Sequence, residues 1–216
     1  DHRDLHSFPT RRSSDLRSRI APCDVQQGVL RWGEVQDPTA HRMGGVSGHA
    51  GVFATADDLA VYAQMLIDGG RFRGKQFLNP GAVAAMTHPQ PLTGSPVLRG
   101  LGWDIQSPYS QEHNAAFPAG SFGHTGYTGC SIWIDPGSET YLIILTNRLH
   151  PNGKGQVKAL RAQVARTVAS TLQLGPALGT LGSASTGADT VSGSHGQSDE
   201  PPRVTVGIDT LAADRF

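Results

Sequence analysis

Apolar residues that recur every three or four positions predict a helix between Thr55 and Gly69. Thr55 is a favoured N-cap, and Asp58 stands three residues later, where its carboxylate can cap the helix in return. Glycines such as Gly69 commonly end helices. A shorter helix is expected to begin at Pro80, a favoured first helical residue, and to end near Thr87.

Two apolar runs in the middle of the chain predict neighbouring strands. Residues 130–134 alternate between two faces, whereas residues 141–145 are apolar throughout, as in a strand covered on both faces. A short turn sequence joins the two runs, which predicts an antiparallel hairpin. Another short strand is expected at residues 101–105. An apolar stripe over residues 155–172 predicts a helix that packs on the hairpin, with Arg161 off its apolar face.

The two ends of the chain lack these patterns. Residues 1–16 have no periodicity and resemble a translated sequencing-adaptor sequence, so we interpret them as a non-native tail, with a genuine disordered tail as the alternative. Residues 175–202 are rich in Gly, Ser, Thr and Pro, which is typical of a flexible linker. Residues 203–216 are interpreted as the truncated start of a second domain. The native domain is therefore expected at residues 17–174.

Composition and charge are those of a globular protein and exclude some partners. The formal net charge is 0, so nothing favours nucleic acid or an anionic membrane as a partner. No apolar stretch approaches the roughly 18 residues of a membrane-spanning helix. The histidines and cysteines lack the spacing of a metal site, and no cofactor is expected. Cys23 and Cys130 could pair in an oxidising compartment, but two free thiols are the simpler interpretation.

The sequence GHTGYTG at residues 123–129 is the sharpest candidate for chemistry. Its glycines can leave room for a ligand along the backbone, its N–H groups can hold an oxyanion, and His124 can carry a proton near neutral pH. A turn with a solvent-exposed histidine explains the same sequence about as well. A Ser–His–Asp triad of Ser47, His124 and an Asp is disfavoured, because GVSGH departs from the Gly-x-Ser-x-Gly elbow.

Two longer blocks resemble one enzyme family. The segments SGHAGVFATADDLAVYAQMLIDGG (residues 47–70) and GHTGYTGCSIWIDPGSETYLIILTNR (residues 123–148) are similar, in order and spacing, to parts of a large group of serine hydrolases. That group includes class C β-lactamases, penicillin-binding proteins and related esterases. The resemblance covers residues 17–174. It implies an α+β fold of the β-lactamase/transpeptidase type, with an antiparallel sheet flanked by helices and the N-terminal part missing.

The resemblance implies a role for several residues around a Lys- or His-Thr-Gly motif on a strand edge. His124 would orient or electrostatically support the substrate, and Thr125 would hydrogen-bond its carboxylate or carbonyl. Gly126 would let the substrate lie against the strand, and the backbone N–H of Tyr127 would be an oxyanion-hole donor. His49 of the Gly-rich loop would face the same cleft, or alternatively the solvent.

The family's nucleophile motif is not in this sequence. Ser-x-x-Lys is absent, because Phe72, Pro151 and Gly155 stand three residues before the lysines, and no Tyr-x-Asn occurs. In the family both motifs precede the Gly-rich loop, so we expect them upstream of Arg17. The 216 residues alone are therefore expected to be inactive.

The resemblance also implies a biological setting. The parent enzyme would act by acyl transfer on cell-wall peptides, β-lactams or related esters and amides, in the periplasm or outside the cell. The end of the chain, VTVGIDTLAADRF, resembles the opening of an exo-N-acetylmuramidase domain and points to peptidoglycan fragments as the substrate. A non-catalytic peptidoglycan-binding module of the same fold is the alternative.

Overall fold

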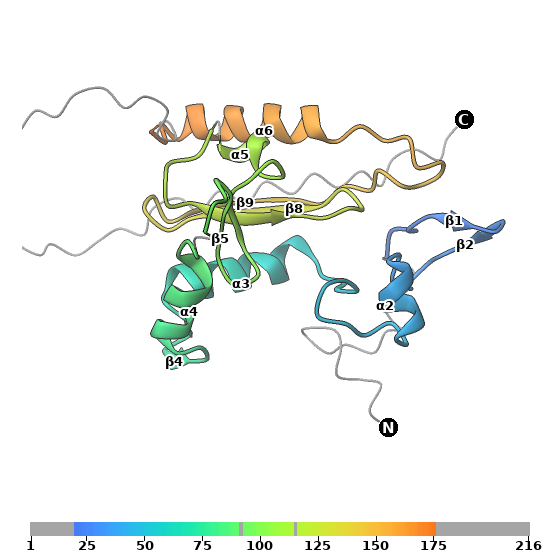
Figure 1. The fold of residues 1–216 in the computed structure, drawn as a ribbon, viewed down its shortest axis with the longest axis horizontal. Helices are drawn as coiled ribbons and strands as arrows, with labels where there is room; N and C mark the ends of the chain where they lie inside the picture. The colour runs from blue at the N-terminus through green and yellow to red at the C-terminus, as the bar shows by residue number, and fades with distance from the viewer. Residues whose placement is uncertain (1–19, 91–92, 115, 176–216) are drawn as a thin grey trace, which may run out of the picture.

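The computed structural model describes residues 20–90, 93–114 and 116–175 (Figure 1). The expected tail at residues 1–16 and the expected second domain at 203–216 lie outside the described residues, as does nearly all of the expected linker. In the described part of the chain, no helix is long and apolar enough to cross a membrane.

A five-stranded antiparallel sheet lies at the centre of the molecule. Its strands follow the order of the sequence, namely β5 (Leu98–Arg99), β6 (Asp104–Gln106), β7 (Phe122–Thr125), β8 (Ser131–Asp135) and β9 (Thr140–Ile144). The predicted hairpin is confirmed as β8 and β9, with Trp133 opposite Leu142. The strand predicted at residues 101–105 is displaced to β6, because Gly102, at φ 85°, turns the chain just before the strand begins.

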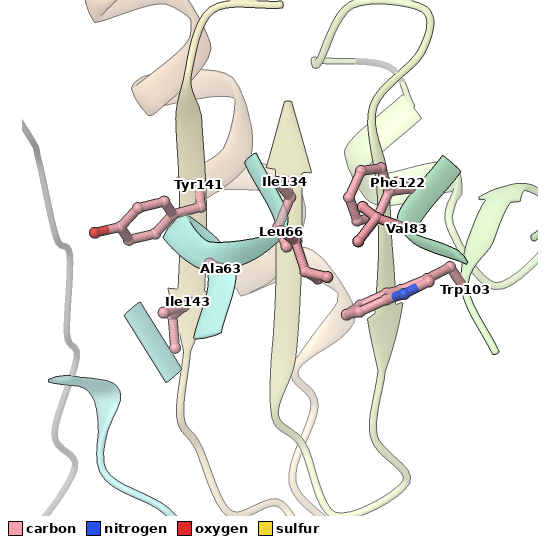
Figure 2. Packing of buried hydrophobic residues seen from close by; sticks show 8 residues of the cluster. All are labelled: Ala63, Leu66, Val83, Trp103, Phe122, Ile134, Tyr141 and Ile143. Atoms are coloured by element: carbon pink, nitrogen blue, oxygen red, sulfur yellow. The ribbon is translucent and has the colours of Figure 1, made fainter. Parts of the chain in front are cut away.

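Helix α3 (Ala56–Ile67) covers one face of this sheet (Figure 1). Ala63 and Leu66 project from the helix onto Ile134 of β8 and Ile143 of β9, as Figure 2 shows. All four side chains are buried, and they belong to a cluster completed by Val83, Trp103, Phe122 and Tyr141. The apolar stripe that predicted the helix is thus the stripe that faces the sheet.

Helices α6 (Lys158–Thr171) and α5 (Gln111–Asn114) lie on the opposite face (Figure 1). Trp133 packs there against Ala165 and Ala169 of α6. The side chains of β8 therefore alternate between two separate apolar clusters, as the period of a strand requires. This confirms that the C-terminal helix packs on the hairpin.

The orientation of α6 differs from the expectation in one respect. Arg161 was expected off the apolar face, but its side chain is buried and only 5% exposed. The buried line of the helix is Arg161, Ala165 and Ala169, while Val164 and Val168 flank it. Alanines at a spacing of four let the helix approach the sheet closely, and the long arginine reaches past them to carbonyl groups at the end of the sheet.

A buried histidine lies between this helix and the sheet. The imidazole of His113 in α5 is stacked on Trp133, with ring centroids 4.9 Å apart, and is fully buried. Burial, and secondarily the charge of Arg161, lowers the pKa of His113 to about 4. This histidine is therefore neutral near pH 7 and acts as an apolar packing element.

The predicted cap of α3 and the predicted start of the second helix are both confirmed. The hydroxyl of Thr55 accepts from the Asp58 N–H at 3.1 Å, and the Asp58 carboxylate accepts in return from the Thr55 N–H, which is the predicted capping box. Helix α4 (Pro80–Thr87) begins at the predicted proline and is capped by Asn79. The short strands β3 (Arg71–Phe72) and β4 (Lys75–Gln76) form a hairpin between these helices.

Residues 20–54 contain little regular structure. A hairpin of β1 (Val25–Gln26) and β2 (Val29–Leu30) precedes α2 (Pro38–Arg42), and the Gly-rich loop follows. Asn147, located after β9, donates from its side-chain amide to the carbonyl groups of Pro22 and Cys23, which ties this region to the end of the sheet. The sulfur atoms of both cysteines are free thiols.

Candidate active site

The predicted site motif spans the end of one strand and the turn that follows it. Gly123, His124 and Thr125 belong to β7 and pair with β8, and the chain then turns before β8 begins. The Gly126 N–H donates to the Cys130 carbonyl at 2.7 Å, and the Gly129 N–H donates to the Gly126 carbonyl at 3.1 Å. The motif thus lies on a tight turn with a defined backbone.

The glycines of this motif have different functions. A Cβ atom on Gly123 would lie 2.2 Å from Trp133 Cε3, and one on Gly129 would lie 2.8 Å from the Thr146 carbonyl oxygen. Their missing side chains accommodate the protein itself, so the expectation that these glycines clear space for a ligand is wrong for both. A Cβ on Gly126 would find no atom closer than 3.5 Å. A small side chain at Gly126 would therefore meet only ordinary van der Waals contacts.

His124 is exposed, and Arg99 of β5 fixes the orientation of its ring. Arg99 Nη2 lies 2.9 Å from His124 Nε2, and His124 Nδ1 lies 2.9 Å from the Thr125 carbonyl oxygen. A guanidinium group can only donate and a carbonyl oxygen can only accept. These two contacts therefore define a neutral imidazole with its proton on Nδ1. The sequence analysis did not single out Arg99, because no motif or periodicity marks a two-residue edge strand.

Tyr127 presents an unused backbone donor. Among the hydrogen bonds of the described residues, none involves its N–H, whereas its carbonyl oxygen accepts from Arg148 Nε at 2.6 Å. The guanidinium of Arg148 also lies over the tyrosine ring, 4.3 Å from its centroid. Tyr127 as a whole is 69% exposed.

Arg161 reaches the same turn from helix α6. Its Nη2 atom donates to the carbonyl oxygens of Gly126 at 3.2 Å and of Cys130 at 2.9 Å. Together with Arg99 and Arg148, it surrounds the turn with positive charge, which favours an anionic group there. The spacing Arg-x-x-x-Ala-x-x-x-Ala in the helix is the sequence signal that could have identified this buried arginine.

Among the described residues, no hydrogen bond or ion pair joins the Gly-rich loop to this turn. His49 Nε2 lies 2.9 Å from an Asp37 carboxylate oxygen, and Asp37 also caps α2 by accepting from the N–H groups of Thr39 and Ala40. The Ala40 N–H first, and then His49, lower the pKa of Asp37. Ser47, the serine of the disfavoured triad, donates to the Ala50 carbonyl at 3.0 Å. Its hydroxyl is thus engaged within the loop.

A cavity of about 290 Å³ lies beside the turn. Its lining residues are Asp24, Val25, Gln36, Tyr127, Leu149, Pro151, Asn152 and Gly153. Tyr127 is the residue that the cavity shares with the predicted site. The cavity therefore adjoins Tyr127 and lies where residues 24–36 meet the segment that follows the sheet.

A family comparison identifies the class of protein. The family model Beta-lactamase matches residues 6–167, well over half of the chain. The chain therefore belongs to the β-lactamase family of serine hydrolases, and its fold is the α+β fold of that family, an antiparallel sheet with flanking helices. The resemblance predicted from the two sequence blocks is confirmed at this level. Nothing in the comparisons supports the expected exo-N-acetylmuramidase-like domain.

Several bacterial proteins are similar in sequence to part of this chain. Proteins of Salmonella newport (strain SL254) and Salmonella agona (strain SL483), each named "Putative D-alanyl-D-alanine carboxypeptidase", are 37% identical to this chain over 122 residues. The match covers 55% of this chain and 28% of each relative, so the chain spans little more than a quarter of their length.

Solved structures give a weaker likeness. A penicillin-binding protein homologue from Caulobacter crescentus is 23% identical with a TM-score of 0.38, over 54% of this chain and 32% of its own. A family VIII carboxylesterase is 18% identical with a TM-score of 0.36, over 52% of this chain and 31% of its own. These values add nothing to what the family match establishes.

Proposed function

We propose that the turn between β7 and β8 is the substrate-binding and oxyanion half of an acyl-transfer site that acts on cell-wall peptides. His124, Thr125 and Gly126 bind and orient the substrate, and the Tyr127 N–H donates to the oxyanion of the tetrahedral intermediate. The observation that carries this proposal is the Tyr127 N–H, which has no partner among the hydrogen bonds of the described residues, beside Gly126, where a Cβ would meet only ordinary van der Waals contacts.

The charges around the turn support a substrate with a carboxylate close to the reacting carbonyl. Arg99 holds His124 as a neutral ring, so the positive charge on this side is carried by Arg99 itself. A peptide that ends in D-alanine has such a carboxylate, and so does a β-lactam. The name of the Salmonella relatives agrees with the first of these substrates. A periplasmic or secreted location follows from a cell-wall substrate.

His49 has a smaller part in this proposal. Its imidazole is engaged with Asp37, and its side chain is 53% exposed. We assign it to holding the Gly-rich loop against α2, from which it contributes to the cleft only indirectly.

The nucleophile is the part of the site that this sequence does not contain. We propose that Ser-x-x-Lys and Tyr-x-Asn lie upstream of Arg17 in the natural protein, and that the 216 residues alone have no turnover. His124, Thr125 and the Tyr127 amide can bind and polarise a carbonyl group, but a covalent acyl-enzyme also needs an activated nucleophile. Without one, roughly 10³–10⁴-fold acceleration over water remains at best.

The test is covalent labelling read by intact mass. The 216-residue chain and the product of the complete reading frame are each treated with a reactive β-lactam and with a fluorophosphonate. We expect one adduct on the longer protein, at the serine of its Ser-x-x-Lys, and none on the 216-residue chain. A stoichiometric adduct on the shorter chain, at Ser47 or elsewhere, would overturn the proposal.

Two substitutions in the product of the complete reading frame test the substrate-binding half of the proposed site. Gly126→Ala is expected to leave the melting temperature unchanged, because its Cβ meets only ordinary contacts, and to slow acylation by obstructing the substrate. His124→Ala is expected to slow acylation by roughly 10-fold or more, as for the loss of an oriented polar group. Normal acylation of both variants would show that the substrate does not lie along β7.

The second candidate function is a peptidoglycan-binding module without catalysis. It is favoured by the absence of Ser-x-x-Lys and Tyr-x-Asn from this sequence. A complete reading frame that lacks Ser-x-x-Lys and a protein that binds muropeptides without acylation would establish it. Binding should then still be weakened by Gly126→Ala.

A further inference from the structure

We propose that Arg161 is a positioning residue that sets the direction of the Tyr127 N–H. The inference rests on the proposed function, because it gives this amide a purpose, but the contacts that carry it are those of the turn itself. Arg161 lies near the start of α6, and its guanidinium contacts the backbone of the turn rather than the proposed substrate-binding side chains in the two hydrogen bonds described above.

One peptide group joins Gly126 to Tyr127 and links the buried arginine to the proposed donor. Its carbonyl oxygen is Gly126 O, and its N–H is the proposed oxyanion donor. A trans peptide is planar, and its C=O and N–H point in opposite directions. Any group that fixes the direction of the Gly126 carbonyl therefore fixes the direction of the Tyr127 N–H.

Arg161 fixes this carbonyl from the inside of the molecule. Its Nη2 atom lies 3.2 Å from Gly126 O and 2.9 Å from Cys130 O, so a single guanidinium nitrogen bridges the two ends of the turn. The Gly129 N–H is a second donor to Gly126 O, at 3.1 Å. With its carbonyl held on that side, the peptide directs its N–H away from α6, and this N–H has no partner among the hydrogen bonds of the part of the chain that the structure describes.

Arg148 holds the next peptide group, which joins Tyr127 to Thr128, by a hydrogen bond to its carbonyl oxygen. Arg148 Nε donates to the Tyr127 carbonyl at 2.6 Å, and the Arg148 N–H donates to the Thr128 carbonyl at 2.8 Å. The peptide groups on both sides of the Tyr127 Cα are therefore held by arginines. The orientation of the donor is thus built into the free protein, which is what an oxyanion hole requires, since its dipoles should not reorganise during the reaction.

The burial of Arg161 supports a positioning role over simple packing. A guanidinium that is 5% exposed loses most of its hydration, and a hydrophobic side chain would fill the same space at less cost. What only a cation provides here is a charge-assisted hydrogen bond to the Gly126 carbonyl. That bond polarises the amide and makes its N–H a stronger donor.

The peptide group can be observed directly by NMR. Tyr127 is the sole tyrosine that follows a glycine in the 216 residues, so a sample with ¹³C-carbonyl glycine and ¹⁵N-tyrosine gives one carbonyl-coupled amide signal. We compare the wild type with Arg161→Met and with Arg166→Met, a matched loss of an exposed arginine from the same helix. The melting temperature of each variant is measured in parallel.

The expected result is a change confined to one variant. Arg161→Met should shift the Gly126 carbonyl carbon upfield, as on loss of a hydrogen bond, and should broaden or move the Tyr127 amide signal. Arg166→Met should leave both unchanged, and Arg161→Lys should restore part of the wild-type shift. If Arg161→Met does not fold, Arg161→Gln, which also removes the cation, is measured in its place. An unchanged signal in folded Arg161→Met or Arg161→Gln would overturn the proposal.

Kinetics of the complete reading frame separate this inference from the proposed function. Arg161→Met should reduce the acylation rate by up to about 100-fold with little change in KM, because a misdirected donor acts on the transition state. If the wild-type protein is not acylated at all, the proposed function is wrong. The NMR signal then still shows whether Arg161 sets the direction of the Tyr127 N–H. If acylation is normal in the variant although the signal has moved, the oxyanion role of this amide is wrong.

Discussion

The sheet and residues 20–54 are stabilised in different ways, although both contain many apolar residues. In the sheet, β8 and β9 place their side chains alternately into two closed clusters. In residues 20–54, Val35 and Ala40 are the buried apolar side chains. The exposed large ones there are Val25, Val29, Leu30, Trp32, Met43, Val46 and Val52.

This difference shows where the free energy of unfolding comes from. Burial of apolar area is its dominant favourable term, so the sheet with α3 and α6 supplies most of it. Residues 20–54 are held by hydrogen bonds such as those from Asn147 to the backbone of Pro22 and Cys23. We expect this region to open locally without unfolding the sheet.

The largest expected effect is a difference in the free energy of unfolding between alanine substitutions of two tryptophans. Trp133 is 1% exposed between the sheet and α6, whereas Trp32 is 38% exposed in the N-terminal region. Trp133→Ala should lower the free energy of unfolding by about 3–5 kcal/mol, because it leaves a large cavity. Trp32→Ala should change it by less than about 1 kcal/mol. Urea denaturation followed by circular dichroism measures both, and equal losses would mean that the two regions unfold as one cooperative unit.

The second effect is a pH dependence that belongs to the sheet region alone. The pKa of His113 is about 4 in the folded chain, against about 6.5 when unfolded, so the unfolded state binds the additional proton between these values. This contribution to stability is complete above about pH 6.5 and is lost as the pH falls towards 4. Over that range it amounts to about 3 kcal/mol.

Denaturation of the wild type and of His113→Leu between pH 4 and 7.5 measures this term, and the variant should lack this part of the pH dependence. The matched control is His41→Gln, which changes an exposed histidine of α2 and should retain the wild-type curve. An identical pH profile for His113→Leu and the wild type would contradict the assignment to His113.

The smallest effect compares two helix caps. Thr55→Ala removes the cap of α3, which packs on the sheet, and should lower the global free energy of unfolding by about 1 kcal/mol. Asp37→Ala removes the cap of α2 and the partner of His49 and should leave the global value unchanged. It should instead accelerate amide exchange within α2. A global loss on Asp37→Ala would show that residues 20–54 unfold together with the sheet.

The sequence predicted the fold best where side-chain periodicity and burial agree. The capping box at Thr55, the start of α4 at Pro80 and the β8–β9 hairpin were all predicted, because local chemistry and packing favour the same structure. The short strands β5 and β6 were not predicted correctly, since elements of two or three residues carry no detectable period. The caps and hairpins of residues 20–54 were missed for the same reason.

The predicted family is confirmed, whereas the roles of the predicted site residues stay a prediction. A motif can indicate His124 and Tyr127, but it cannot indicate which glycine faces a ligand and which one faces Trp133, because that depends on strand register. Arg99 and Arg161 were missed because hydrophobic patterns count every arginine as surface. Their contacts with His124 and Gly126 join residues 25 and 35 positions apart in the sequence.

Strand β9 has a hydrogen-bonded neighbour only on its β8 side within the described residues. Its side chains are already packed on both faces, yet the outer row of its backbone N–H and C=O groups has no strand beside it. An incoming strand would be held there by main-chain hydrogen bonds, whatever its side chains. Among the described residues, the sheet therefore ends at β9 with unpaired main-chain groups, and a strand added there would extend the β8–β9 pairing by one place.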